Sequence, residues 1–222
     1  MASEVDICNL ALAHLGDTAT VSSINPPEGS AQAEHCARFY PIARDSLLEM
    51  HTWGFATTRV TLASIGSSWP EWKYCYAAPS DMLNALGILD PYASDDYAAG
   101  NNYGFTQTGV PLIGSGTYTP QPFAMESLPD GTPVIYTNQD GAVLRYTRTV
   151  TDTTLFSPLF IDALGWSLAS YLAGPLIKGD AGAAEAKRCY AAFQLAFGKA
   201  AVSDANQRRT QVSQNVAWVA GR

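Results

Sequence analysis

The sequence predicts an α+β fold that is mainly α: an antiparallel four-helix bundle, a β-rich insert between helices 2 and 3, and an extended C-terminal arm. Three observations lead to this prediction. Residues 31–50 repeat apolar side chains at three- and four-residue steps, the period of an amphipathic helix. Two further apolar helical stretches follow Ser157 with a short turn between them, which predicts an antiparallel hairpin. The last twenty residues turn polar and indicate an arm.

The N-terminal half predicts two helices. Ser3 can cap the first helix, and Gly16 is a natural stop for it. Pro41 lies inside the second helix and should kink it, because proline removes a backbone hydrogen bond. The apolar stripe of the second helix consists of Cys36, Tyr40, Ala43, Leu47 and Met50.

The middle of the chain predicts strands. The helical period stops at Gly54, and residues 55–63 then alternate as in a half-buried strand. Residues 71–77 predict a second strand, and 79–81 a helical turn or bend leading toward Leu89. Residues 134–136 and 142–147 flank Asn138-Gln139-Asp140-Gly141, which predicts a hairpin.

The C-terminal half predicts the other two helices. Ser157-Pro158 has the N-cap and N1 arrangement that opens the third helix. Its expected inner face is Phe160, Leu164, Ser167, Leu168, Tyr171 and Leu172. The fourth helix is expected over about 181–202, with the inner face Ala186, Tyr190, Phe193, Phe197 and Ala200.

These elements divide the chain into three parts. Residues 1–63 and 150–203 form the expected helical core, and 64–149 form the β-rich acidic insert. Within the insert, residues 92–132 lack a sustained period and predict a long projecting loop. Residues 204–222 form the expected C-terminal arm.

The composition indicates the cellular compartment in which the protein is made. The four cysteines, Cys8, Cys36, Cys75 and Cys189, are widely spaced, which favours free thiols in a reducing cytosol. The start has acids where a secretory signal needs basic residues. The apolar stretch 163–177 is shorter than a membrane span. A soluble protein made in the cytoplasm is expected.

The net charge of −7 belongs to the middle third. No Lys or Arg occurs between Lys73 and Arg145, whereas the acids there are Asp81, Asp90, Asp95, Asp96, Glu126, Asp130 and Asp140. Such a segment repels nucleic acid and anionic membranes. The plain interpretation is a solubilising acidic surface.

The order of several short motifs resembles the head-to-tail adaptor family of short-tailed bacteriophages, also called tail tubular protein A. The first helix carries Asn9, Ala11-Leu12 and Leu15-Gly16. The second helix and its exit carry Ala33, Cys36, Tyr40, Arg44-Asp45, Leu47-Leu48, His51, Trp53 and Phe55-Ala56. Tyr76 with Pro79-Ser80-Asp81, and then Leu159-Phe160 with Ala163-Leu164, follow in the family's order. The resemblance covers about residues 1–90 and 150–203.

The resemblance implies a structural virion protein without catalytic activity. Family members form a homo-oligomeric ring, typically of twelve copies, at the head–tail junction. The ring acts as a connector that binds the portal protein above and the tail nozzle protein below. The genome passes through its channel for retention and ejection, without specific binding of double-stranded DNA and without a membrane partner. The seven acids of the middle third would then be the charge of the channel, unless they lie on the outside of the ring. The chain is expected in the host cytoplasm before virion assembly.

Candidate contact residues follow from this interpretation. The arm would anchor to the portal through Arg208, Arg209, Val216, Trp218 and Val219; the alternative is a frayed terminus. Tyr40, Arg44 and Asp45 are expected to join helix to helix or subunit to subunit. The long loop would contact the nozzle or a neighbour through Tyr92, Tyr97, Tyr103, Phe105 and Tyr118.

Two other functions stay open at this point. A tail-associated cell-wall hydrolase would need two carboxylates about 5–10 Å apart. The acids that could be nominated are Glu34, which has Arg38 one turn away, and the pair Asp81 with Asp90. A small-molecule-binding domain would use residues 92–118 as a lid. The three histidines lack metal-ligand spacing, and no nucleotide-binding motif is present, so no metal or cofactor is expected.

Overall fold

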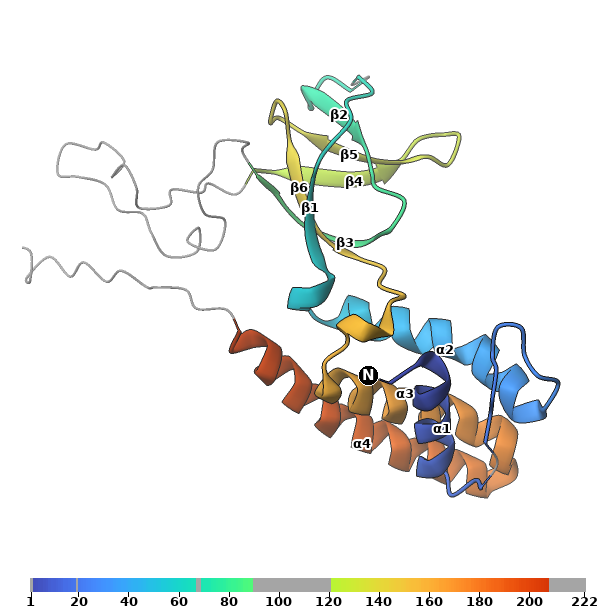
Figure 1. Cartoon of the computed structure of the whole chain (residues 1–222). Coiled ribbons are helices and arrows are strands. Elements are labelled where there is room, and N and C mark those ends of the chain that lie inside the picture. The colour runs from blue at the N-terminus through green and yellow to red at the C-terminus, as the bar shows by residue number, and fades with distance from the viewer. Residues whose placement is uncertain (1, 19, 67–68, 90–120, 208–222) are drawn as a thin grey trace, which may run out of the picture. The chain divides into compact units, whose positions relative to one another are not determined.

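The computed structural model of the chain describes residues 2–18, 20–66, 69–89 and 121–207, and it divides into two compact units (Figure 1). One unit comprises 1–56 and 149–207 and is helical. The other comprises 57–148 and is built from strands. Each unit is described by itself below.

The helical unit contains four α-helices and two short 3-10 turns. The helices are α1 Glu4–His14, α2 Ala31–Met50, α3 Pro158–Ile177 and α4 Gly179–Ala205. The turns are η1 Gly54–Ala56 and η3 Thr153–Leu155.

Serine side chains cap the first three helices. Ser3 accepts a hydrogen bond from the Asp6 amide, and the Asp6 carboxylate accepts one from the Ser3 amide in return, which completes a capping box. Ser30 and Ser157 accept from the third amide of α2 and α3 in the same way. The predicted helix starts at Ser3 and Ser157 are confirmed.

The fold-class prediction of a four-helix bundle with a β insert is wrong. α3 forms the extensive contact with α4, and α1 and α2 also pack on α3 (Figure 1). The helices are also unequal, from 11 residues in α1 to 27 in α4. They therefore gather around one central helix, whereas a bundle needs four comparable helices around a shared axis. The strands form two sheets with a core of their own.

A glycine lets α3 and α4 approach closely. A Cβ added to Gly182 would lie 3.0 Å from the Ala173 carbonyl oxygen. The reversal between the helices is made by Lys178 and Gly179, which both have positive φ. Gly174-Pro175, expected to disrupt the end of the third helix, lies inside α3, which continues to Ile177.

By length and composition alone, α3 could cross a membrane. Among the described residues it is the one helix that meets these two criteria. The apolar stretch 163–177 is part of this longer helix, which begins at Pro158 as the sequence predicts. Half of its apolar window is buried inside the unit. The buried half packs against the other helices of the unit.

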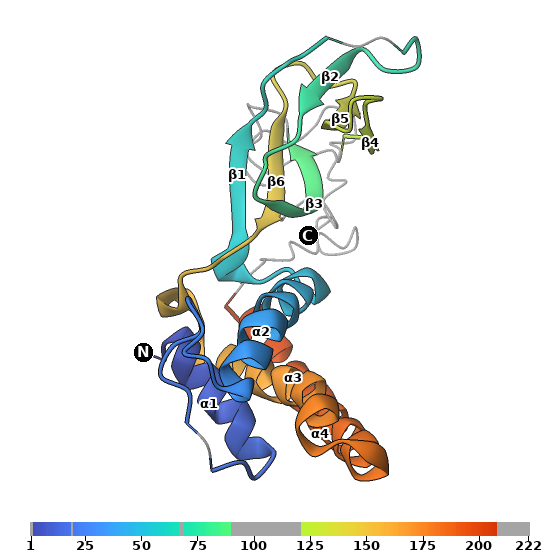
Figure 2. The ribbon, with the colours of Figure 1, turned by 90° about the vertical axis from the view of Figure 1, so that its right-hand side faces the viewer.

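The second unit consists of two three-stranded antiparallel sheets. The strands are β1 Thr57–Thr61, β2 Tyr74–Ala77, β3 Met82–Leu89, β4 Phe123–Ser127, β5 Pro133–Thr137 and β6 Val143–Arg148. Their orders are β1-β6-β3 and β2-β5-β4. Figure 2 shows β6 between β1 and β3.

Two predictions for this region are wrong, and a third is right only at its start. β5 and β6 pair with strands of different sheets, so Asn138–Gly141 carries the chain from one sheet to the other and makes no hairpin. The turn or bend predicted at 79–81 is present, since the Met82 amide donates to the Pro79 carbonyl at 3.2 Å, but the chain continues toward Leu89 as the strand β3. The expected loop 92–132 contains β4.

The two sheets share an apolar core. Its buried members come from both sheets and their connections: Leu62, Tyr76, Ile88, Ile135, Ala142, Leu144 and Tyr146. The Tyr76 hydroxyl donates to the Gln139 carbonyl at 2.9 Å, and the Tyr146 hydroxyl donates to Asp81 at 3.0 Å. Both tyrosines thus bury their rings while their polar ends are satisfied.

Candidate protein-interaction surface

α4 has two apolar faces, and only one is used inside the helical unit. Its buried face consists of Gly182, Cys189, Phe193, Ala196 and Ala200. A second stripe lies about half a turn away and is exposed: Ala184, Ala191, Leu195, Gly198 and Val202. Leu195 is 72% exposed and Val202 63%. This stripe, called the α4 outer face below, is typical of a helix that packs against another protein.

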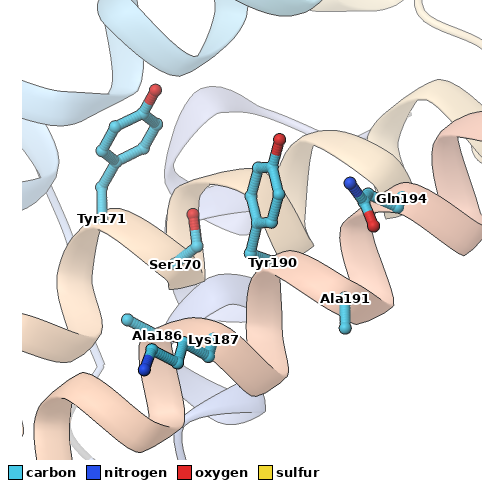
Figure 3. Close-up of a pocket in the computed structure, with 7 residues that line it drawn as sticks. All are labelled: Ser170, Tyr171, Ala186, Lys187, Tyr190, Ala191 and Gln194. Carbon is cyan, nitrogen blue, oxygen red and sulfur yellow. The ribbon is translucent and has the colours of Figure 1, made fainter.

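A shallow groove adjoins the α4 outer face. It has a volume of about 380 Å³ and lies between α3 and α4, with Tyr171 on α3 and Tyr190 on α4 (Figure 3). Figure 3 shows the two tyrosine rings pointing to the same side. Tyr171 also stacks on Phe39 of α2, with ring centroids 6.0 Å apart. Lys187 and Gln194 supply polar groups at the groove, and its lining contains no carboxylate.

The exposed tyrosines correct the predicted inner faces. Tyr171 is 40% exposed and Tyr190 51%, although both were expected in the core. The buried face of α4 is centred on Cys189 and Ala196 instead, which turns Tyr190 outward. Phe160, Leu164, Leu168 and Leu172 of α3, and Phe193 and Ala200 of α4, are buried as predicted.

One face of α2 is exposed and mostly polar, but it also contains a large apolar side chain. Glu34, Arg38 and Glu49 are exposed there. Ile42 is 49% exposed and lies between these charged residues along the helix. The face opposite to it is buried and contains Ala33, Cys36, Tyr40, Ala43 and Leu47.

The predicted interface group on α2 lies within the helical unit. Tyr40 is buried, and the Arg44 guanidinium lies over its ring at 5.9 Å. Arg44 donates to both carboxylate oxygens of Asp45, at 2.8 and 3.2 Å. Burial raises the pKa of the Tyr40 phenol. These contacts fix the side chains along one helix and keep the Arg44 guanidinium paired with the Asp45 carboxylate.

The joint after α2 is fixed by the end of α4. Asp204 accepts a hydrogen bond from the Gly54 amide at 2.9 Å and lies 3.3 Å from Nε2 of His51. Trp53 meets the His51 ring edge to face, with centroids 4.8 Å apart, and donates from its indole to the Leu47 carbonyl at 2.8 Å. α4 therefore continues through Ala205 as part of the helical unit.

A ring stack lies at the end of α1. His14 stacks on Trp166 of α3 with ring centroids 3.6 Å apart, and the Arg188 guanidinium lies over the same indole. Arg188 also donates to the His14 carbonyl and pairs with Glu185. Burial, which outweighs the opposing effect of Asp162, lowers the pKa of His14.

We expect the helical unit to lose stability as the pH falls below about 6.5, the usual histidine pKa. The folded state holds His14 neutral, so the unfolded state binds more protons in this range and is favoured. Thermal unfolding at pH 7.5 and 5.5 measures the effect. The His14→Phe variant keeps a ring against Trp166 and should show a smaller drop in Tm. Equal drops in both proteins would contradict a role for His14.

The predicted channel acids do not form one cluster among the described residues. Asp81 precedes β3, Glu126 and Asp130 belong to β4 and the turn after it, and Asp140 lies in the crossing between β5 and β6. Asp90, Asp95 and Asp96 lie outside the described residues, as do Tyr92, Tyr97, Tyr103, Phe105 and Tyr118. The arm residues Arg208, Arg209, Val216, Trp218 and Val219 also lie outside them.

Within the described parts of the chain, no three His, Cys, Asp or Glu side chains gather as metal ligands would. The four cysteines are free and buried. Cys8 of α1 and Cys36 of α2 make a thiol contact that, together with burial, raises the pKa of Cys8. Buried thiols of this kind behave as small apolar side chains.

No family model matches the chain, and a search of curated proteins finds no significant match. The surface described above therefore carries the functional argument. The sequence analysis predicts the apolar stripe through Tyr190 and Phe197 and does not include the α4 outer face. The seven- and four-residue steps from Ala184 through Ala191 to Leu195 were the signal that could have shown it.

Proposed function

We propose that this chain is a structural head-to-tail adaptor of a short-tailed bacteriophage. Copies of it form a ring that binds the portal protein on one side and the tail nozzle protein on the other, while DNA passes through without specific binding. In this role the protein belongs to the head–tail junction of the virion and to the host cytoplasm before assembly.

The observation that carries the proposal is the α4 outer face. One apolar face of α4 is buried in its own unit, and the large side chains of the other face, Leu195 and Val202, are 72% and 63% exposed. A helix with such a second apolar face is suited to stable contact with another protein. The assignment to the adaptor family rests on the order of the short sequence motifs named above. Several of those motif residues, Cys36, Tyr40, Leu47 and Trp53, are buried and determine the packing of the helical unit.

The groove favours a binding role over hydrolysis. Glycosidic cleavage needs a pair of carboxylates at the substrate, whereas the groove presents two tyrosines, Lys187 and Gln194. Glu34 lies on the exposed face of α2, where the nearby cation Arg38 is also exposed. Nothing in the groove supplies an acid and a base to the same ligand.

The test uses the purified chain and the purified portal protein of the parent virus. We expect the full chain to add a ring to portal assemblies, seen by sedimentation velocity and electron microscopy. Deletion of 208–222 should lower portal binding at least tenfold, because the arm would make the portal contact.

The deletion starts at 208 so that Asp204 and α4 stay intact. Its thermal unfolding should therefore match that of the full chain. Failure of the full chain to bind the portal would overturn the adaptor proposal, and undiminished binding by the deletion would overturn the role of the arm.

A further inference from the structure

The turn between β4 and β5, called the β4–β5 tip below, has a fixed backbone. The Gly131 amide donates to the Leu128 carbonyl at 2.8 Å, and the Leu128 amide donates to the Thr132 carbonyl at 2.9 Å. Pro129 and Asp130 occupy the two central positions, and Gly131 has a φ of +86°, as in a three-residue hairpin loop. Because this backbone is ordered before a partner arrives, a contact through it costs less conformational entropy.

The β4–β5 tip is negatively charged. Residues 125–133 contain Glu126 and Asp130 but no Lys, Arg or His, and both acids are exposed. The Thr132 amide donates to the Asp130 carboxylate at 2.9 Å, and this hydrogen bond lowers the pKa of Asp130. Asp130 is therefore ionised at neutral pH. Pro129 is also exposed and places an apolar ring next to this carboxylate.

The groove between Tyr171 and Tyr190 has the complementary chemistry (Figure 3). Lys187 is the charged residue among those that line it, and Gln194 offers amide N–H groups to the carbonyls of a turn. Aromatic-lined grooves are a usual binding surface for prolines. A proline followed by a carboxylate therefore suits both the tyrosine rings and the lysine of this groove.

The chain itself supplies such a ligand at Pro129-Asp130. The β4–β5 tip belongs to the strand-built unit and the groove to the helical unit, so the two surfaces are unlike. Contacts between unlike surfaces are heterologous, and they produce a ring where the rotation closes. A copy can thus give its tip to one neighbour and receive the tip of another in its groove.

We infer that the β4–β5 tip of one copy docks in the Tyr171–Tyr190 groove of a second copy, with Pro129 against the tyrosine rings and Asp130 beside Lys187. The contact deepens the proposed adaptor function and rests on it for the closed ring. The contact is small, and closure strengthens it because each further contact in a ring becomes intramolecular.

The first experiment measures self-association of the full chain by sedimentation velocity over a range of concentrations, alone and with the portal protein. Tyr190→Ser should weaken association about tenfold, because tyrosines are among the side chains on which protein contacts depend most. Ile42→Ser is the matched control, since Ile42 is 49% exposed on a helix and does not line the groove. Its association should equal that of the unaltered chain, and equal association of Tyr190→Ser overturns the inference.

A double-mutant cycle tests the charge pair. Asp130→Asn keeps an oxygen that can accept from the Thr132 amide but removes the negative charge. Asp130→Asn and Lys187→Ala should each weaken association about threefold, and the double variant should be little weaker than either single one. Circular dichroism checks that every variant is folded. Fully additive losses would show that the two residues do not meet and would overturn the docking geometry.

Crosslinking shows whether the contact joins two copies. Ser127→Cys lies near the tip and Ala191→Cys in the groove lining; both positions are exposed, and the four native cysteines are buried. A short bismaleimide added to a mixture of the two variants should give crosslinked dimers on denaturing gels. A chain with both substitutions should give a ladder of larger species. Crosslinking confined to single chains overturns the contact between copies.

The outcomes separate this contact from the adaptor function. Self-association that depends on Tyr190, without portal binding by the full chain, would support the contact and overturn the adaptor proposal. Complete rings of Tyr190→Ser on the portal would support the adaptor proposal and overturn the contact. A full chain that stays monomeric both alone and with the portal overturns the contact.

Discussion

Trp53→Ala should destabilise the helical unit by about 3–5 kcal/mol, the usual cost of deleting a large buried aromatic side chain. Trp53 is 1% exposed, and its ring meets Phe160 edge to face with centroids 5.0 Å apart. The substitution removes this contact, leaves a cavity, and deprives the Leu47 carbonyl of its indole donor. Urea unfolding followed by circular dichroism measures the loss in the transition of the helical unit.

Trp53→Phe provides the control for this prediction. Phenylalanine keeps an apolar ring against Phe160 but lacks the indole N–H, so a smaller loss is expected. A loss below about 1 kcal/mol for Trp53→Ala would show that the site collapses around the missing ring and that the aromatic cluster is not central to the unit.

Asp204→Ala should lower the stability of the helical unit by about 1–3 kcal/mol, the cost of leaving a partly buried donor without its acceptor. The Asp204 carboxylate accepts from the Gly54 amide and contacts His51, so it joins the end of α4 to the turn after α2. Chemical denaturation measures the change in free energy of unfolding.

Two substitutions make this second prediction specific. Asp204→Asn keeps an oxygen that can accept from the Gly54 amide and should retain much of the stability. Ser203→Ala alters the exposed neighbouring residue and should change stability by less than about 0.5 kcal/mol. Equal losses for Asp204→Asn and Asp204→Ala would show that the negative charge, and not the amide acceptor, stabilises the joint.

Local signals predicted the helices well. Ser3 and Ser157 identified two helix starts because a capping serine acts only on the amides of the following turn. The stripe from Cys36 to Met50 identified the buried face of α2 for a similar reason, since it repeats with the helix itself, although its last member, Met50, is 52% exposed. Such features depend on residues that are close in sequence.

Predictions that needed distant partners failed. Asn138–Gly141 has good turn residues, but these do not determine whether the flanking strands pair with each other, and β5 and β6 pair elsewhere. Tyr190 lies on the predicted stripe of α4, yet the buried face keeps only Phe193 and Ala200 of that stripe and is turned toward Gly182, where α3 and α4 approach closely. Choosing between two apolar faces requires the position of the neighbouring helix.

The pairing of β1 with β6 has a consequence for how the chain acquires its shape during synthesis. Ninety residues separate Thr57 from its partner Thr147. β1 therefore emerges from the ribosome long before the strand that covers its edge, and the nascent chain must carry an open strand edge in the meantime. Long-range pairing of this kind folds slowly, so we expect the strand-built unit to mature after translation has passed residue 148.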